Sequence, residues 1–222
     1  MVETKIIILD QQEIVYKIHY KRIKNCYLRV EKGEVVIRCS PLFPQSEIEK
    51  LIRNHQEEIL EQIKGYVPKY NYQEDGYVYL FNQKYQIVLK DMNIKKCAIH
   101  DRQIYVYSKN IQASIEMFLK QELMNYLKER IDFYLSMSFH HVFPEIQIKK
   151  MKRRWGACFY QKNRVCFNLV LAHIDYALID YVIVHELCHF LEANHSKAFY
   201  HEIEKRMQDY KERERLLKDV GI

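Results

Sequence analysis

Two histidines and a glutamate, spaced as HExxH, stand in the most apolar segment of the chain. His185 and His189 are four residues apart, so on a helix both imidazoles project from one face. Two imidazoles at this spacing can bind one zinc ion. Glu186 would lie beside the metal, where its carboxylate can take a proton from a water molecule and return it to a leaving amine. The spacing therefore predicts a zinc site with a general base next to it.

A catalytic zinc site needs a third protein ligand and one open coordination position. His195 is the first candidate, and because it stands six residues after the second histidine, the chain must turn between them. Asn194 tolerates a left-handed conformation and Ser196 can cap a following helix, which favours a turn at this point. Glu202 and Glu204, on that next helix, are the alternative ligands.

The alternative to a metal site is a core helix whose histidines only make local hydrogen bonds. Apolar residues surround the HExxH segment on nearly every side: Leu178, Ile179, Val182, Ile183, Val184, Leu187 and Phe190. Unpaired imidazoles and a carboxylate are costly to bury in such surroundings. The pattern therefore favours a bound metal.

Three segments carry a resemblance to a known family: RRWGAC, NLVLAHIDYALIDYVIVHELCHF and NHSKAFY, all after Lys152. With them the chain resembles the YgjP-like zinc metallopeptidases, relatives of the SprT-like and WLM proteases. The resemblance extends more weakly over most of the chain. Ala157 stands where the family usually has serine, and His173-Ile174 replaces a common turn that contains proline. Neither departure falls on a metal ligand.

The resemblance implies a zinc ion held by His185, His189 and His195, with Glu186 as general base. It implies a compact zincin-like domain with its HExxH helix, following a β-rich half. The expected activity is hydrolysis of peptide bonds by a zinc-activated water, with peptides or proteins as substrates.

The segment that begins with Arg154 and Trp155 is expected to form a strand beside the HExxH helix. The free edge of such a strand could accept an extended peptide by strand addition. The simpler interpretation of this tryptophan, the only one in the chain, is that it packs over the core. The two interpretations are compatible.

The sequence also offers candidates for orienting a ligand histidine and for stabilising an oxyanion. Asp180 could orient a ligand histidine, or it could simply be an acid favoured near a helix N-terminus. A group that stabilises the oxyanion of the tetrahedral intermediate would help catalysis, and Arg154, Tyr181, Tyr200 and His201 are the candidates.

Two other functions follow from the same residues. The basic run Lys149–Arg154 could attract nucleic acid, so the chain could be a nucleic-acid-associated binding module in which the zinc is only structural. The simpler interpretation is that these basic residues are exposed to solvent next to a strand. Aromatic residues do not alternate with them, as a surface that stacks nucleic-acid bases would require. A zinc hydrolase of non-peptide amides would use the same active-site chemistry.

The expected elements give an α+β fold in which a β-rich region, residues 1–109, precedes a zincin-like domain, residues 110–222. The hydrophobic periodicity predicts helices over Ser46–Gly65, about 25 residues from Ile111, Asp175–Glu192 and Ser196–Asp209. Runs of β-branched and aromatic residues predict these strands: Lys5–Leu9, Ile14–His19, Tyr27–Val30, Val35–Cys39, Tyr77–Phe81, Tyr85–Leu89, Lys96–His100, Ile104–Tyr107, Ile146–Lys149, Arg154–Phe159 and Arg164–Asn168. No internal repeat is evident in the sequence.

The composition is that of a folded protein. The chain has 222 residues, of which 48% are hydrophobic, and a net charge of +6. This charge is a mild excess, below that of a dedicated nucleic-acid binder. Six cysteines without a CxxC pair favour reduced thiols, and we expect a cytoplasmic protein because neither a secretory signal nor a membrane span is evident.

Overall fold

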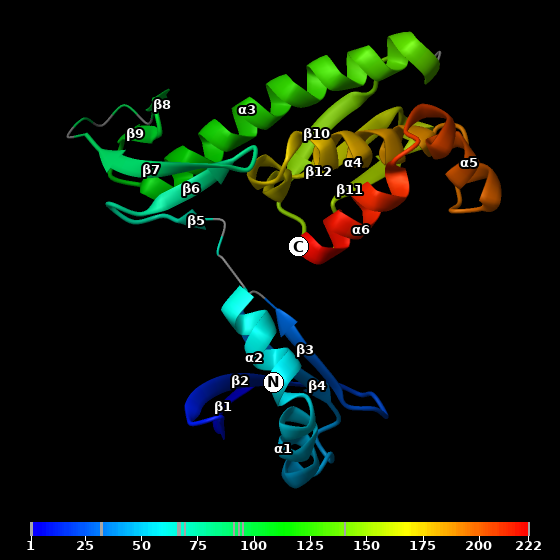
Figure 1. Ribbon diagram of the computed structural model, residues 1–222. Coiled ribbons are helices and arrows are strands. Elements are labelled where there is room, and N and C mark those ends of the chain that lie inside the picture. Colours follow the sequence, from blue (N-terminus) through cyan, green and yellow to red (C-terminus); the bar gives the residue numbers. More distant parts are fainter. Residues whose placement is uncertain are drawn as a thin grey trace. The chain divides into compact units, whose positions relative to one another are not determined.

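The computed structural model describes residues 2–31, 33–65, 68, 70–90, 92, 94, 96–139 and 141–221. The chain forms two compact units, Met1–Pro68 and Lys69–Ile222 (Figure 1). No helix in the described part of the chain is both long and apolar enough to cross a membrane. All six cysteines are free thiols, as the sequence predicted.

The first unit is a four-stranded sheet covered by two helices. The strands have the order β1-β2-β4-β3 and comprise Val2–Leu9, Gln12–Tyr20, Glu34–Cys39 and Tyr27–Glu31. Helices α1 (Gln45–Asn54) and α2 (Gln56–Gly65) bury their isoleucines on it. The sequence predicted one helix here, but the chain breaks at His55, whose Nδ1 lies 3.0 Å from the Leu51 carbonyl oxygen and whose backbone leaves the helical region.

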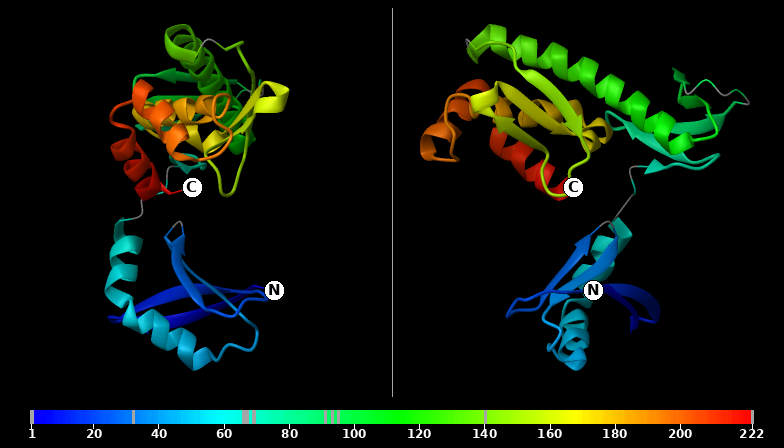
Figure 2. Two further views of the ribbon diagram at one scale, coloured as in Figure 1. Left: turned by 90° about the vertical axis from the view of Figure 1, so that its right-hand side faces the viewer. Right: turned by 180° about the vertical axis from the view of Figure 1, so that it is seen from behind.

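The second unit contains two sheets joined by one long helix. The five-stranded sheet has the order β5-β6-β7-β9-β8 and comprises Tyr70–Asn71, Tyr77–Leu80, Gln83–Leu89, Gln103–Tyr107 and Lys96–His100. The three-stranded sheet has the order β10-β12-β11 and comprises Glu145–Lys149, Arg164–Asn168 and Gly156–Phe159. Helix α3 (Ile111–Tyr134) contacts β8 and β9 of the first sheet and β10 of the second, and the right view of Figure 2 shows it running along both sheets. The helix has 24 residues, close to the predicted length, and a π-helical turn, Leu135–Phe139, follows it before Pro144.

Three helices complete the second unit: α4 (Tyr176–Cys188), α5 (Lys197–Arg206) and α6 (Tyr210–Val220). The sequence did not predict α6, because charged residues dominate its composition. Tyr210 and Leu217 nevertheless bury one side of α6, and Arg213 donates a hydrogen bond to the Ala177 carbonyl oxygen in α4. Helix α4 is buried nearly all round, which its uniformly apolar sequence requires.

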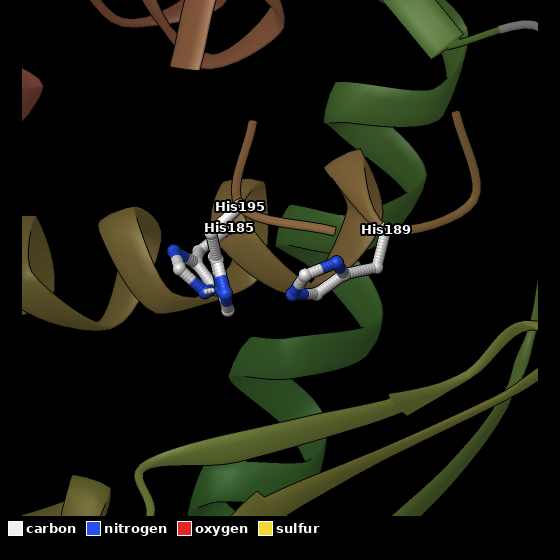
Figure 3. Close-up of side chains that lie close together, drawn as sticks. All are labelled: His185, His189 and His195. Carbon is white, nitrogen blue, oxygen red and sulfur yellow. Dashed lines mark hydrogen bonds between the residues drawn. The ribbon is translucent and has the colours of Figure 1, made fainter. Parts of the chain in front are cut away.

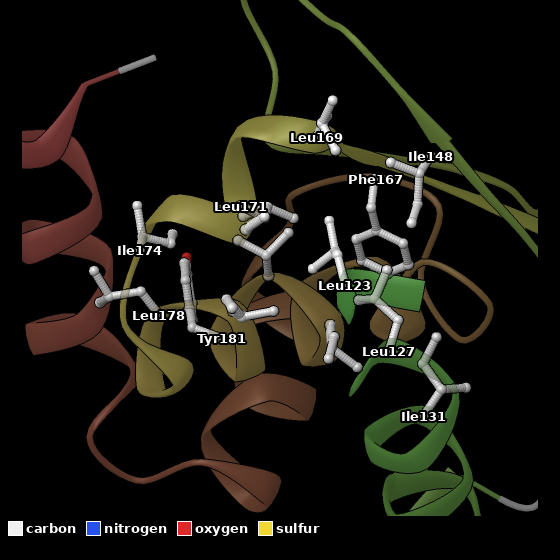
Figure 4. Close-up of a cluster of buried hydrophobic side chains, with 14 of the residues drawn as sticks. Leu123, Leu127, Ile131, Ile148, Phe167, Leu169, Leu171, Ile174, Leu178 and Tyr181 are labelled. Atoms are coloured by element: carbon white, nitrogen blue, oxygen red, sulfur yellow. The ribbon is translucent and has the colours of Figure 1, made fainter. Parts of the chain in front are cut away.

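One apolar core runs through the whole second unit. In Figure 4 side chains of α3 meet those of β10, β12 and α4, among them Leu127, Phe167 and Tyr181. The same core takes in Val78 of β6 and Val106 of β9. The structure therefore divides the chain near residue 68 instead of near residue 110, because the strands over Tyr77–Tyr107 bury their apolar face in the core around α3.

The two units share a strand order that the sequence did not reveal. In each, two hairpins are joined so that the second and fourth strands pair in parallel, and a helix follows: β1-β2-β4-β3 with α1, and β6-β7-β9-β8 with α3. Both first hairpins turn through two residues of positive φ, Asp10-Gln11 and Phe81-Asn82. Such pairs match the twist of the strands that they connect. The β-rich half is thus one strand arrangement used twice.

Helix α4 is fixed to α3 by a buried ion pair. Asp180 accepts hydrogen bonds from Arg130 (Nη2–Oδ2 2.7 Å), Tyr126 (2.8 Å) and Tyr134 (3.0 Å), all on α3. This arrangement corrects the expectation that Asp180 orients a ligand histidine, because its carboxylate faces α3. The pKa of the Arg130 guanidinium is raised chiefly by its hydrogen bond to Asp180.

We expect Asp180→Ala to lower the free energy of unfolding by about 3 kcal/mol, since it leaves the Arg130 guanidinium partly buried without its counter-charge. Urea denaturation measures this change. Asp209→Ala is the matched control, because the Asp209–Arg213 pair is more exposed, and it should cost about 0–1 kcal/mol. Equal losses in the two variants would contradict the prediction.

Candidate metal centre

Helix α4 and the segment after it present the two histidines of the HExxH motif. Asp175 caps the helix by accepting a hydrogen bond from the Ala177 amide at 2.8 Å. The helix ends at Cys188, so His185 lies in its last turn and His189 is the first residue beyond it, still in right-handed helical conformation. Both side chains therefore keep the one-face spacing that the sequence predicted.

The chain turns after His189 and brings His195 back. The Ser196 amide donates to the Asn194 carbonyl oxygen at 2.7 Å, and Ser196 Oγ caps α5 by accepting from the Phe199 amide at 3.3 Å. The predicted turn and cap are therefore both present. Asn194, however, is not among the described residues with positive φ, so the turn forms without a left-handed residue there.

The three imidazoles converge on one point (Figure 3). His185 Nε2 and His195 Nε2 are 3.0 Å apart, and one nitrogen from each of the three rings lies within 4.8 Å of the others. The fully buried Phe199 packs against all three rings, with centroid separations of 4.5–5.0 Å. This ring limits where the histidines can move.

The donor set fits a metal ion. His189 Nδ1 lies 3.2 Å from the Glu192 carbonyl oxygen, so it carries the proton and leaves Nε2 free as a ligand. His185 Nδ1 is buried without a hydrogen-bond partner in the described part of the structure. Burial first, then the neighbouring His189 and His195, lower the pKa of His185 to about 3, and burial lowers that of His189. Neutral imidazoles are the form that binds zinc.

The alternative third ligands lie elsewhere. The Glu202 carboxylate is paired with Lys205 and with Arg206, whose Nη1 is 2.6 Å from Glu202 Oε2. Within the described residues, the group with metal-ligand geometry contains the three histidines and neither Glu202 nor Glu204. This geometry favours His195 as third ligand.

Glu186 is a buried carboxylate held by the segment that contains β11. Only 5% of the residue is exposed, and Gly156 lies directly against its carboxylate. Burial raises the pKa of Glu186 to about 8, against the opposing effects of the Arg154 charge and of a hydrogen bond from the Cys158 backbone amide. A carboxylate with a raised pKa suits repeated proton transfer near neutral pH.

Gly156 leaves no room for a side chain. A Cβ there would lie 2.5 Å from Glu186 Oε1 and 2.7 Å from its Cγ, so Gly156→Ala must displace the carboxylate or the strand. We expect this variant to bind metal as the wild type does and to slow by at least about tenfold any hydrolysis in which Glu186 transfers a proton, since proton transfer depends on position. Gly65→Ala, where a Cβ meets nothing within 4 Å, is the control. Equal activity in the two variants would contradict the prediction.

The other predicted site residues lie around this centre. Trp155 packs against the core, as the simpler interpretation predicted, and Arg154 is exposed while its charge acts on Glu186. The Tyr200 ring lies 6.4 Å from that of His195 and stacks on Tyr210 of α6 at 6.2 Å. Arg154 and Tyr200 therefore stay candidates for contact with a substrate.

Sequence reasoning missed three residues that build the site: Gly156, Phe199 and Asn168. Gly156 and Phe199 lie within motifs that carried the family resemblance, but nothing in their residue types indicated a contact with Glu186 or with the histidines. Asn168, only 2% exposed, ends β12 and hydrogen-bonds the segment before β11. A polar residue at the end of an apolar strand was the only signal for it.

Comparison with known proteins gives a family for this chain. A family model described as YgjP-like, metallopeptidase domain, matches residues 24–220. The solved structures that are similar include two metallopeptidase zymogens. Abylysin of Pyrococcus abyssi is 16% identical with a TM-score of 0.39, over 42% of this chain and 94% of that one. Jannalysin of Methanocaldococcus jannaschii is 26% identical with a TM-score of 0.35, over 40% and 89%. No curated protein matches.

Proposed function

The chain belongs to the YgjP-like metallopeptidase family, and from this premise we propose that it is a zinc-dependent peptidase of the HExxH type. His185, His189 and His195 would hold the zinc ion, and Glu186 would be the general base. The observation that carries the proposal is the convergence of three imidazoles, one of which, His185, directly precedes a buried glutamate in the chain. The family supports the reaction class, and the geometry supports the choice of residues.

In the proposed reaction the protein's own groups position the reactants and move one proton. His185, His189 and His195 would hold the zinc ion, which when bound would supply Lewis acidity toward a water molecule and the scissile carbonyl. Glu186 takes a proton from the attacking water and gives it to the leaving amine. Its buried position, next to the exposed Arg154, keeps this carboxyl group shielded from bulk solvent.

Strand β11 is the proposed place for the substrate backbone. Among the described strands it pairs with β12 alone, and it forms one edge of the three-stranded sheet (Figure 1). Its residues Gly156 and Cys158 are the ones that contact the Glu186 carboxylate. A peptide that adds to this edge as a further strand would therefore pass the general base in extended form.

The two alternative functions are less well supported. A structural zinc site would be closed by a fourth protein ligand, whereas the described ligand group has three members. In the basic run that suggested nucleic acid, Lys150 is paired with Glu116 at 2.6 Å, which reduces its free charge. Hydrolysis of non-peptide amides uses the same residues, so assays with small amide substrates distinguish it from peptide hydrolysis.

Removal of the metal tests the proposal. We expect a strong zinc chelator to abolish hydrolysis of a quenched fluorescent peptide, and stoichiometric zinc to restore it, because neutral imidazoles select zinc over hard cations. Magnesium added in place of zinc is the control and should restore nothing. Hydrolysis that persists in zinc-free protein, verified by elemental analysis, would contradict the proposal.

A further inference from the structure

We propose that Asn168 is a positioning residue for Glu186, because its buried carboxamide clamps the segment Met151–Gly156 that packs on the general base. The role of Glu186 as general base rests on the proposed function. The clamp itself rests on contacts that hold whatever the reaction is.

Asn168 uses almost all of its hydrogen-bonding capacity on one segment. Its Nδ2 donates to the carbonyl oxygens of Met151 (2.8 Å) and Arg154 (2.9 Å). Its Oδ1 accepts from the amides of Met151 (3.2 Å) and Val170 (3.4 Å). Its own amide donates to the Trp155 carbonyl oxygen at 2.8 Å. One residue thus ties three backbone positions of the segment to the end of β12.

The segment needs this support because it has no regular structure of its own. Residues 150–155 lie between β10 and β11 and belong to neither strand, so the regular strand pairing does not include them; the backbone bond between the Asn168 amide and the Trp155 carbonyl oxygen is the exception among the described contacts. Backbone groups in such a position need side-chain or solvent partners. The carboxamide of Asn168 is the side chain that supplies them for Met151 and Arg154.

The clamped segment leads directly to Glu186. Gly156 follows Trp155 and lies so close to the Glu186 carboxylate that no Cβ fits between them. Two residues later, the Cys158 amide bonds the same carboxylate, while the Arg154 charge acts on it from the exposed side. A shift of the segment would therefore change the position of Gly156, of the Cys158 amide and of the Arg154 charge relative to Glu186 at the same time.

The clamp is separate from the zinc ligands. The metal-ligand group consists of three histidines at the end of α4 and in the segment before α5. In the described structure, the hydrogen-bond partners of Asn168 are instead backbone groups at residues 151, 154, 155 and 170. Loss of the clamp should therefore change the position of the general base and leave zinc binding intact.

The test uses Asn168→Asp in the full chain. This variant keeps the size and the acceptor Oδ1 but puts an oxygen opposite the carbonyls of Met151 and Arg154, where the two donated hydrogen bonds were. We expect zinc content to stay at the wild-type level, kcat to fall about tenfold or more, and KM to change little. Asn168→Ser, which removes the donors without adding a charge, should give the same pattern if the aspartate variant unfolds.

Two spectroscopic readouts report on the clamp without any assay of activity. Trp155 is the only tryptophan in the chain, so acrylamide quenching of its fluorescence should increase in Asn168→Asp. The Cys158 amide resonance, identified by its shift in Glu186→Gln, should also move. Asn110→Asp is the matched control, because that side chain caps α3 through its oxygen and aspartate caps equally well.

The outcomes separate the clamp from the proposed function. Unchanged Trp155 quenching and an unchanged Cys158 resonance in a folded Asn168→Asp protein would contradict the proposal that the Asn168 side chain positions the segment Met151–Gly156. A fall in thermal stability with wild-type kcat per zinc-loaded molecule would reduce Asn168 to a structural residue and overturn its positioning role. If the wild-type protein hydrolyses no peptide, the proposed function fails, and the two spectroscopic readouts still decide the clamp.

Discussion

The variant Glu186→Gln is expected to lose peptide hydrolysis while it keeps one zinc ion per chain. The amide has the shape of the carboxylate but cannot accept a proton, and general-base catalysis contributes about a hundredfold to ten-thousandfold to such a reaction. We therefore expect a fall of about a hundredfold to ten-thousandfold, with removal of the buried acid having a neutral or slightly favourable effect on folding. Steady-state hydrolysis of a quenched fluorescent peptide, with elemental analysis of the same sample, measures both quantities.

Glu204→Gln is the matched control for this loss. Glu204 is an exposed glutamate on α5 and was an alternative zinc ligand on sequence grounds. Its substitution should leave both hydrolysis and zinc content at the wild-type level. Hydrolysis by Glu186→Gln at the rate of the control would show that Glu186 is not the general base.

The second large effect is expected from His195→Ala, which should remove zinc. Loss of a partner that only orients a ligand already weakens metal affinity by about 10-fold to 100-fold, so loss of a ligand should exceed about a hundredfold. The two remaining imidazoles, His185 in the last turn of α4 and His189 just after it, cannot close the site without the turn that brings His195 back. Competition with a chromophoric chelator measures the affinity.

His201→Ala controls for the loss of a histidine near the site. His201 is exposed on α5 and does not belong to the ligand group in the described structure, so its substitution should leave zinc affinity unchanged. Wild-type affinity in His195→Ala would instead exclude His195 and return the choice to Glu204, or to Glu202 after release of its partners Lys205 and Arg206.

The local elements were predictable because each depends on a short pattern. The long helix from Ile111 and a strand at each predicted position are present, since alternation and helical periodicity are set by neighbouring residues. The strand predicted over Arg154–Phe159 begins only at Gly156, so Arg154 and Trp155 lie outside it. The break at His55 and the helix Tyr210–Val220 were not predicted. Helix α6 is mostly polar and is stabilised by contacts with α4, which no local pattern contains.

The candidate site also has features that the sequence predicts and features that depend on the tertiary structure. The sequence by itself determined which residues could hold a metal, because the spacing of His185 and His189 on an apolar helix fixes their common face. It also placed His195 beyond a turn, but it left Glu202 and Glu204 open as ligands. The tertiary structure favours His195, because the Glu202 carboxylate is held by Lys205 and Arg206.

Only the tertiary structure decided how Glu186 is held and what Asp180 does. Gly156, at the start of β11, lies against the Glu186 carboxylate on α4, and Arg130 and Tyr134 hold Asp180 from α3. These contacts join residues about 30–50 positions apart in the chain, so they depend on how the elements pack. The sequence specified the chemistry of the side chains and their local spacing, whereas packing specified their distances, burial and partners.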